Sequence, residues 1–346
     1  MNSFAIYRLP YATTCTRIEQ HGDRPQQLQS CTQLDGQQGF VLAPFQATPA
    51  QPILLIRADR VEQLPIESAI PTPPCVATTD DHRSDYAADF ACFHSQLAAG
   101  TFSKLVLARS VTLCCTVTPD PMTLFWQACQ CYPRLFIALA ALPDGTCWLT
   151  ATPEILLENT GHEWRTVALA GTMSLSGNEL LGEGENARWS TKNIQEQRYV
   201  ATYIAENLKQ QGISYSEEGP RTVRAANLVH LRSDFTFGLP SHCKAGQLLQ
   251  ALHPTPAVCG LPKQAALDFI LRHEHCQRQY YSGFMGPLGV GGQTHLYVSL
   301  RCMQLAHDRL TLYAGGGLLR DSVEEQEWQE TEDKLETMRR LLRPHK

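Results

Sequence analysis

The feature that most constrains the fold is a run of apolar segments between residues 104 and 173. The stretches 104–114, 135–145, 146–159 and 164–173 have the composition of β-strands, and turn sequences such as Pro-Asp-Gly and Asn-Thr-Gly lie among them. Consecutive strands joined by short turns pair in antiparallel fashion. The run therefore predicts antiparallel sheet rather than a regular alternation of parallel strands and helices.

Helices are predicted in separate blocks. Helical periodicity covers 85–100, about 187–211 and 265–273, and a last helix follows the glycines at 315–317. Further strands are expected at 39–45, 54–61, 296–305 and 309–313. Such blocks favour an α+β fold of packed antiparallel sheets with helices outside. A proline-rich stretch near 63–85 predicts a connection between a less informative N-terminal portion (1–80) and a catalytic portion (about 85–342).

Composition narrows the class of protein. The net charge is −5, and no block of basic residues occurs that would indicate nucleic acid or a membrane surface as a partner. The thirteen cysteines are odd in number, and Cys114 and Cys115 are adjacent, which favours reduced thiols over a disulfide framework. The N-terminus lacks the pattern of a signal peptide, and no apolar stretch is long enough to span a membrane. We expect a cytoplasmic protein.

The last helix carries acids on its apolar face. Ser322 and Glu325 fit a capping box at its start. Successive residues lie about 100° apart, which places Glu327, Glu330 and Lys334 on the stripe of the apolar side chains. The opposite, solvated face carries Glu325, Glu332 and Glu336. Burying two carboxylates is costly unless cations compensate, although long side chains can also reach outward to solvent.

A second helix repeats this arrangement. Glu196 shares its stripe with Tyr199, Val200 and Tyr203, so it faces inward. Two helices that present carboxylates to the interior indicate an oxygen-ligand site for a hard divalent cation, and we expect Mg²⁺. A buried Glu196 paired with an arginine is the alternative.

Three more charged residues are candidates for chemistry. Lys104 shares a strand face with apolar residues, where desolvation would make its amine a base, or it is simply solvated. Glu154 stands in an apolar strand and is either a general acid or an edge-strand carboxylate. Arg301 serves either a buried acid or a carboxylate ligand. The backbone of Ala314–Gly317 either binds an anion or makes a tight turn.

Taken together, these segments resemble the chorismate-utilising enzymes, from about residue 104 to the C-terminus. The resemblance rests on FSKLVLAR, TPEILL, LAGT, the helix of Glu196, LVHL, HPTPAVCGLP, YYSGFMG, SLRC and AGGGLLRDSVEEQEWQET, in this order. It implies a single α+β domain over 1–346, made of two stacked antiparallel sheets flanked by helices. It also implies that chorismate and Mg²⁺ bind in a central cleft.

The resemblance assigns roles by position. Glu196 and Glu330 resemble direct magnesium ligands, and Glu327 a ligand that acts through water. The substrate's other anionic group would face Arg301, Lys334 and the backbone of Gly315. The ring site would be lined by Gly171, Thr172 and His230.

The nucleophile differs among members of this family. In having a lysine at position 104, the chain resembles the members that add water. Ala170 stands where some aminodeoxychorismate synthases carry a nucleophilic lysine. The resemblance therefore implies that Lys104 deprotonates a water that attacks C2 of chorismate. Glu154 would protonate the leaving C4 hydroxyl, and the product would be isochorismate, as in isochorismate synthases.

Other readings stay open at this point. A salicylate synthase forms isochorismate and then eliminates pyruvate. An anthranilate synthase subunit and a catalytically silent chorismate-binding protein are less favoured. Gln197, Asn193 and Cys259 depart from the family pattern. Neither the pathway, menaquinone or siderophore, nor the oligomeric state follows from the sequence, and no obligatory protein partner is predicted.

Overall fold

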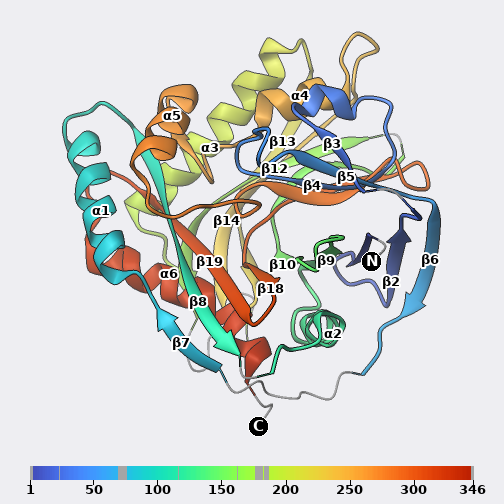
Figure 1. Ribbon diagram of the computed structural model, residues 1–346. Coiled ribbons are helices and arrows are strands. Elements are labelled where there is room, and N and C mark those ends of the chain that lie inside the picture. Colours follow the sequence, from blue (N-terminus) through green and yellow to red (C-terminus); the bar gives the residue numbers. More distant parts are fainter. Residues whose placement is uncertain are drawn as a thin grey trace.

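The computed structural model describes residues 3–343 except 23, 69–75, 116, 162, 176–181 and 183–186. Its strands form two sheets, in which every described strand pair is antiparallel (Figure 1). This confirms the predicted α+β class with two antiparallel sheets.

The first sheet contains most of the apolar run. In spatial order its strands are β15 (Gly260–Leu261), β8 (Lys104–Cys115), β19 (Arg309–Leu318), β18 (Cys302–Ala306), β10 (Cys147–Thr152), β9 (Phe136–Ala141), β1 (Phe4–Arg8), β2 (Thr14–Glu19) and β6 (Arg60–Pro65). β7 (Val76–Asp80) pairs with the far end of β8. The N-terminal strands thus extend the sheet that carries Lys104.

The second sheet also combines early and late parts of the chain. Its order is β13 (Tyr215–Ala225), β14 (Leu228–Phe237), β12 (Trp164–Ser174), β11 (Ile155–Asn159), β17 (Thr294–Val298), β16 (Phe284–Leu288), β4 (Gly39–Ala43), β5 (Ile53–Arg57) and β3 (Gln26–Leu28). A core of aromatic and aliphatic side chains lies between the sheets, where the rings of Phe136 and Tyr297 stack at 4.2 Å between centroids. Burial of this apolar surface holds the two sheets together.

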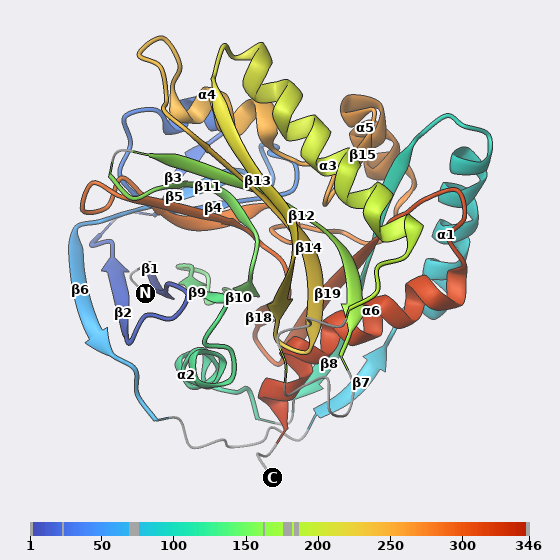
Figure 2. The same ribbon diagram turned by 180° about the vertical axis from the view of Figure 1, so that it is seen from behind.

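Helices cover the outer faces (Figures 1 and 2). α2 (Pro121–Cys131), α6 (Glu324–Arg339) and the short η3 (Arg340–Leu342) pack on the first sheet. α3 (Thr191–Gln210), α4 (Ala245–Leu252) and η1 (Cys31–Leu34) pack on the second. α1 (Arg83–Ala98) and α5 (Lys263–His273) enclose the edge of the first sheet beside β8.

Two predicted strands are each broken where the chain crosses between the sheets. The stretch 146–159 divides into β10 of the first sheet and β11 of the second. The stretch 296–305 divides into β17 of the second sheet and β18 of the first. Glu154 and Arg301 lie at these crossings, so neither belongs to a continuous strand. The prediction of one strand over 296–305 is wrong at Arg301, because its φ of +46° interrupts the extended backbone.

Other boundaries also differ from the predictions. The capping box at Ser322 is not formed: α6 begins at Glu324 after Val323, and the Ser322 hydroxyl accepts from the backbone N–H of Leu319 at 3.0 Å. The glycines at 315–317 make no turn, because they lie within β19 and pair with β8. The β13–β14 hairpin and α2 were not predicted, and the prolines of the predicted 63–85 connection lie partly outside the described residues.

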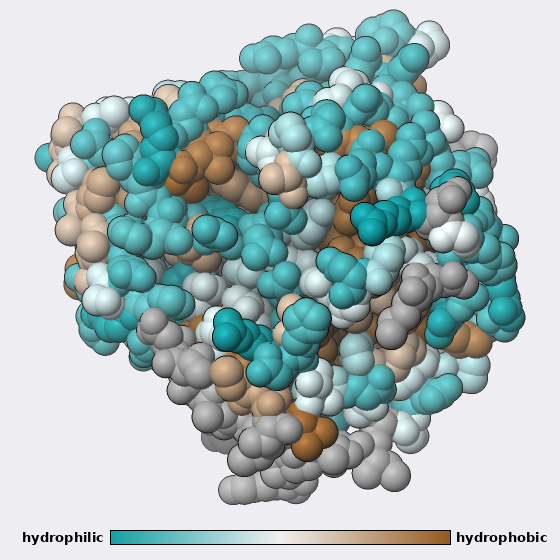
Figure 3. Space-filling model, viewed as in Figure 1, coloured by the Kyte–Doolittle hydropathy of each residue, from teal (hydrophilic) through white to brown (hydrophobic). Residues whose placement is uncertain are grey.

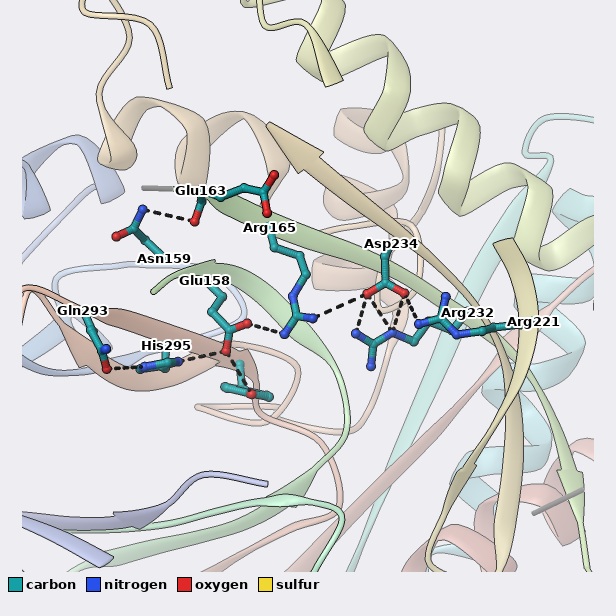
Figure 4. Close-up of polar contacts among 10 residues, drawn as sticks. Glu158, Asn159, Glu163, Arg165, Arg221, Arg232, Asp234, Gln293 and His295 are labelled. Carbon is teal, nitrogen blue, oxygen red and sulfur yellow. Dashed lines mark hydrogen bonds and ion pairs between the residues drawn. The ribbon is translucent and has the colours of Figure 1, made fainter. Parts of the chain in front are cut away.

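A charged network lies on the second sheet (Figure 4). Glu158 Oε1 forms a hydrogen bond with His295 Nδ1 at 2.8 Å, and Arg165 donates a hydrogen bond to Glu158 Oε2. Asp234 pairs with Arg221 at 2.6 Å and with Arg232 at 2.5 Å. Burial alone would raise the pKa of both acids, but the hydrogen bond with His295 and the neighbouring arginines offset it and leave each pKa below its usual value. Each acid already has its cations, so the network ties neighbouring strands together.

The face of the molecule seen in Figure 3 is mostly hydrophilic, with apolar residues gathered in small separate patches. Among the described helices, none has the length and apolar character needed to span a membrane.

Candidate active site

The two crossings between sheets lie side by side and bring Glu154 and Arg301 into one site. The backbone N–H of Val298 donates to the carbonyl of Glu154 at 2.9 Å, and that of Ala151 donates to the carbonyl of Arg301 at 3.1 Å. Each crossing is thus bonded to the strand beside the other. Arg301 is 5% exposed and its Nη1 makes no hydrogen bond, so the guanidinium has donors left for a ligand.

A cavity of about 50 Å³ opens at this place. Among its lining residues are Glu154, Gly171, Thr172, Glu196, His230, Arg301, Gly315 and Lys334. The fold therefore gathers all the predicted substrate-binding residues and the candidate acid. Pockets for small organic ligands usually measure about 300–1,000 Å³. The present arrangement is therefore too tight for a ring substrate, and side chains must move for one to enter.

Lys104 and Glu196 meet beside this cavity. Lys104 is fully buried, and its Nζ lies 2.9 Å from Glu196 Oε1. The alternatives of a solvated lysine and of a Glu196–arginine pair are therefore wrong. Gly317 makes the approach possible, since a Cβ at this position would lie 2.1 Å from Glu196 Oε1. Burial alone would raise the pKa of Glu196, but Lys104 and Lys192 more than offset it and lower that pKa.

The acids of α6 lie beside the glycines of β19. Glu327 is 2% exposed and is bonded by Lys192 of α3, while Glu330 pairs with Lys334 at 2.7 Å. Lys334 also donates to the carbonyl of Gly315 at 2.8 Å, so this glycine presents its carbonyl rather than its N–H to a partner. The inward orientation predicted for Glu327 is confirmed, and Glu330 is half-buried.

His230 links Arg301 to the bulge in β12. His230 Nδ1 lies 2.9 Å from the carbonyl of Gly171, and its Nε2 lies 2.8 Å from Arg301 Nη2. Burial, Arg301 and Lys334 hold the pKa of His230 well below its ordinary value, so the ring is neutral. It therefore donates through Nδ1 and accepts through Nε2. Gly171 has a φ of +72°, and its N–H points at Glu196 Oε2 at 3.2 Å.

Glu154 has the electrostatic character of a general acid. It is 2% exposed. Burial raises its pKa to about 8, against the lowering effect of Lys104, Arg301 and Lys334. At neutral pH the carboxyl group therefore keeps its proton, which it can then give to a leaving group. An exposed edge-strand carboxylate, the alternative reading, is wrong.

The three candidate metal ligands are each occupied by a lysine. Lys104 holds Glu196, Lys192 holds Glu327 and Lys334 holds Glu330. In the part of the chain that the structure describes, no three acidic, histidine or cysteine side chains are arranged as a preformed metal shell. To hold a metal ion together, these carboxylates would first have to leave their lysines.

The residues nevertheless fit a magnesium ion in their chemistry. All three are carboxylates, which suit this hard cation. Oε2 of Glu327 is buried and makes no hydrogen bond of normal geometry. Gly316 leaves room beside the acids of α6, since a Cβ there would lie 3.5 Å from both Glu327 Oε2 and Glu330 Oε1.

Sequence reasoning missed two residues of this region. Lys192 stands one helical turn before Glu196, and this spacing was a signal that it shares the same face. Tyr281 lines the cavity, and a Cβ at Gly315 would lie 2.8 Å from its hydroxyl. Its motif gave no indication of this contact.

The departures from the family pattern have structural roles here. Asn193 packs against Gly171, where a Cβ would lie 3.1 Å from that of Asn193. Gln197 is buried and donates to the carbonyl of Ala168 at 3.1 Å, which ties α3 to β12. Cys259 is fully buried, and burial raises its pKa to about 12, so it is no nucleophile.

Comparison with known proteins identifies the family of this chain. The profile of the chorismate binding enzyme family matches residues 53–343. The chain is 31% identical to isochorismate synthase MenF of Escherichia coli (strain K12) over 71% of this chain and 57% of that protein. It is 35% identical to a salicylate biosynthesis isochorismate synthase of Pseudomonas aeruginosa over 72% of this chain and 52% of that protein. The chain thus spans little more than half the length of these relatives.

A solved structure has the same fold. A putative 2,3-dihydroxybenzoate-specific isochorismate synthase, DhbC from Bacillus anthracis, superimposes with a TM-score of 0.82. The superposition covers 98% of this chain and 96% of that one at 22% sequence identity. The match to the family profile covers more than half of the chain and shows the family. The chain belongs to the chorismate binding enzyme family.

Proposed function

We propose that the protein is an isochorismate synthase, which converts chorismate to isochorismate by adding water at C2 and releasing the C4 hydroxyl. The observation that carries the proposal is a fully buried lysine paired with the cavity-lining Glu196, together with the buried carboxyl group of Glu154 in the same cavity. The names of relatives similar to this chain, two of them isochorismate synthases, support the same reaction.

The proposed reaction uses Lys104 and Glu154 as a base and an acid. Lys104 takes a proton from the water that attacks C2, and Glu154 gives its proton to the C4 oxygen, which leaves as water. The ring double bonds shift, and the enolpyruvyl group stays in place. General acid and base groups of this kind each contribute roughly 10²–10⁴-fold to the rate.

The other site residues would bind and orient the substrate. Arg301, with a buried Nη1 that makes no hydrogen bond, would receive one carboxylate of chorismate. Neutral His230 fixes the plane of the Arg301 guanidinium, and Lys334 adds a second positive charge. Gly171, Thr172 and the backbone of Gly315 would contact the ring and its substituents.

Magnesium is part of the proposal. Glu196 and Glu330 would bind it directly and Glu327 through water. The ion would supply positive charge for the ring carboxylate of chorismate. Lys104 Nζ lies 2.9 Å from Glu196 Oε1, so Glu196 would have to leave Lys104 before it binds the ion. Only an unprotonated amine can take a proton from water, so Lys104 would act as the base in that form.

A cytoplasmic location, and a product destined for menaquinone or siderophore biosynthesis, complete the proposal. Among the similar proteins are a menaquinone-specific and a vibriobactin-specific isochorismate synthase, which support such uses.

Product analysis tests the proposal. Purified protein is incubated with chorismate and Mg²⁺, and the products are separated by chromatography. We expect isochorismate in equilibrium with chorismate. Salicylate formed without a partner lyase would indicate a salicylate synthase instead, and unchanged chorismate would indicate a binding protein.

A further inference from the structure

Lys192 is a charged residue of the site that has no role in the proposed reaction. It lies in the first turn of α3 and donates from Nζ to Glu327 Oε1 of α6. The side chain of Lys192 is 28% exposed, whereas that of Glu327 is only 2% exposed. The contact therefore joins the two helices that carry the candidate metal ligands, and its cationic partner is the one nearer to solvent.

The acids of α6 need a cation in this position. Glu327 and Glu330 both flank Gly316, and a buried carboxylate beside another is strongly unfavourable without compensation. Lys334 reaches Glu330, and Lys104 reaches Glu196. Lys192 is the lysine that neutralises Glu327.

A metal ion bound by the acids of α6 would need the place beside Glu327 that the Lys192 ammonium occupies. An ammonium bonded to Glu327 and a divalent cation shared with Glu330 compete for one carboxylate. Because Lys192 is partly exposed, its long side chain can swing out so that the ammonium is solvated by water. Lys104, in contrast, is fully buried and has no such route to solvent.

We propose that Lys192 is an exchangeable counter-cation, which occupies Glu327 in the metal-free protein and leaves it when a divalent cation binds. The inference rests on the proposed function for the identity of the metal ligands. It has two consequences: Lys192 stabilises the metal-free site, and it weakens magnesium binding relative to the same acids without it.

The test uses Lys192→Met in the full-length protein, with Lys209→Met as the matched control. Lys209 lies near the end of the same helix and is exposed. Thermal unfolding without metal and calorimetric titration with MgCl₂ are measured in the absence of chorismate. We expect Lys192→Met to lower the Tm of the metal-free protein and to decrease the Kd for Mg²⁺ at least about tenfold, because a nearby positive charge is removed. Lys209→Met should change neither.

Two further variants guard the interpretation. Lys192→Arg keeps the charge, so its Kd should stay near that of the wild type even if Lys192→Met folds poorly. In a Glu327→Gln background, Lys192→Met should no longer lower the Tm of the metal-free protein, because the partner charge has been removed.

An unchanged or increased Kd in Lys192→Met, or no saturable Mg²⁺ binding to either protein, would overturn the inference. Because these titrations contain no chorismate, the outcome is independent of the product. Isochorismate formation with an unchanged Kd would refute only the role of Lys192. A decreased Kd without isochorismate would refute only the proposed reaction.

Discussion

Replacement of Glu154 by glutamine should stabilise the protein at neutral pH and remove most of its activity. Glu154 is 2% exposed, and burial raises its pKa from an ordinary 4.5 to about 8. Between these two pH values the unfolded chain loses the proton while the folded protein keeps it. The folded state then binds more protons, so the free energy of unfolding falls as the pH rises.

The size of the effect follows from the two pKa values. One pH unit corresponds to about 1.4 kcal/mol, so at pH 7 the penalty from Glu154 is about 3 kcal/mol. Above pH 8 it levels off at about 5 kcal/mol, and near pH 4.5 it vanishes. Glutamine has nearly the same shape and no charge, so the variant escapes the penalty.

Urea unfolding of the metal-free wild type and of Glu154→Gln, at several values between pH 5 and pH 8.5, measures this difference. We expect the variant to gain stability over the wild type as the pH rises, and to lose about 10²–10⁴-fold in kcat as a missing general acid. Parallel stability curves would refute the raised pKa. A kcat near that of the wild type would refute the role of Glu154 as the acid.

Three other predictions concern the remaining parts of the site. Gly317→Ala places a Cβ 2.1 Å from Glu196 Oε1 and should lower kcat at least about 100-fold in a turnover assay, because it displaces that carboxylate. Gly238→Ala is the control: its Cβ meets nothing within 4 Å, so kcat should not change. Arg301→Met should raise the KM for chorismate at least about tenfold through loss of a charged contact; an unchanged KM would contradict this. Removal of divalent cations with EDTA should abolish turnover and added Mg²⁺ should restore it; full activity in EDTA would exclude the metal.

The sequence was most informative where a regular element presents one face to the interior. The helical period placed Glu327 and Glu196 inward; Glu327 is buried, and the side chain of Glu196 is only 12% exposed. Alternation along a strand likewise placed Lys104 with buried apolar residues. In these cases side-chain direction follows from local geometry, which the order of residues determines.

The crossings at Glu154 and Arg301 could not be predicted in this way. Each lies in a mainly apolar stretch that has the pattern of one strand, because a break between two sheets leaves apolar residues on both sides. Pro153, directly before Glu154, was a signal of the first break. The contact between Lys192 and Glu327 depends on how α3 approaches α6, which no local pattern specifies. The helix α2 did carry a signal, since Asp120 caps it and Pro121 begins it.

The central claim is that water attacks C2 of chorismate, and labelled water tests it most directly. The protein is incubated with chorismate and Mg²⁺ in H₂¹⁸O, and the product is analysed by mass spectrometry and NMR. The account predicts isochorismate that carries one ¹⁸O atom, located in the C2 hydroxyl. Isochorismate without the label, or no isochorismate at all, would contradict it.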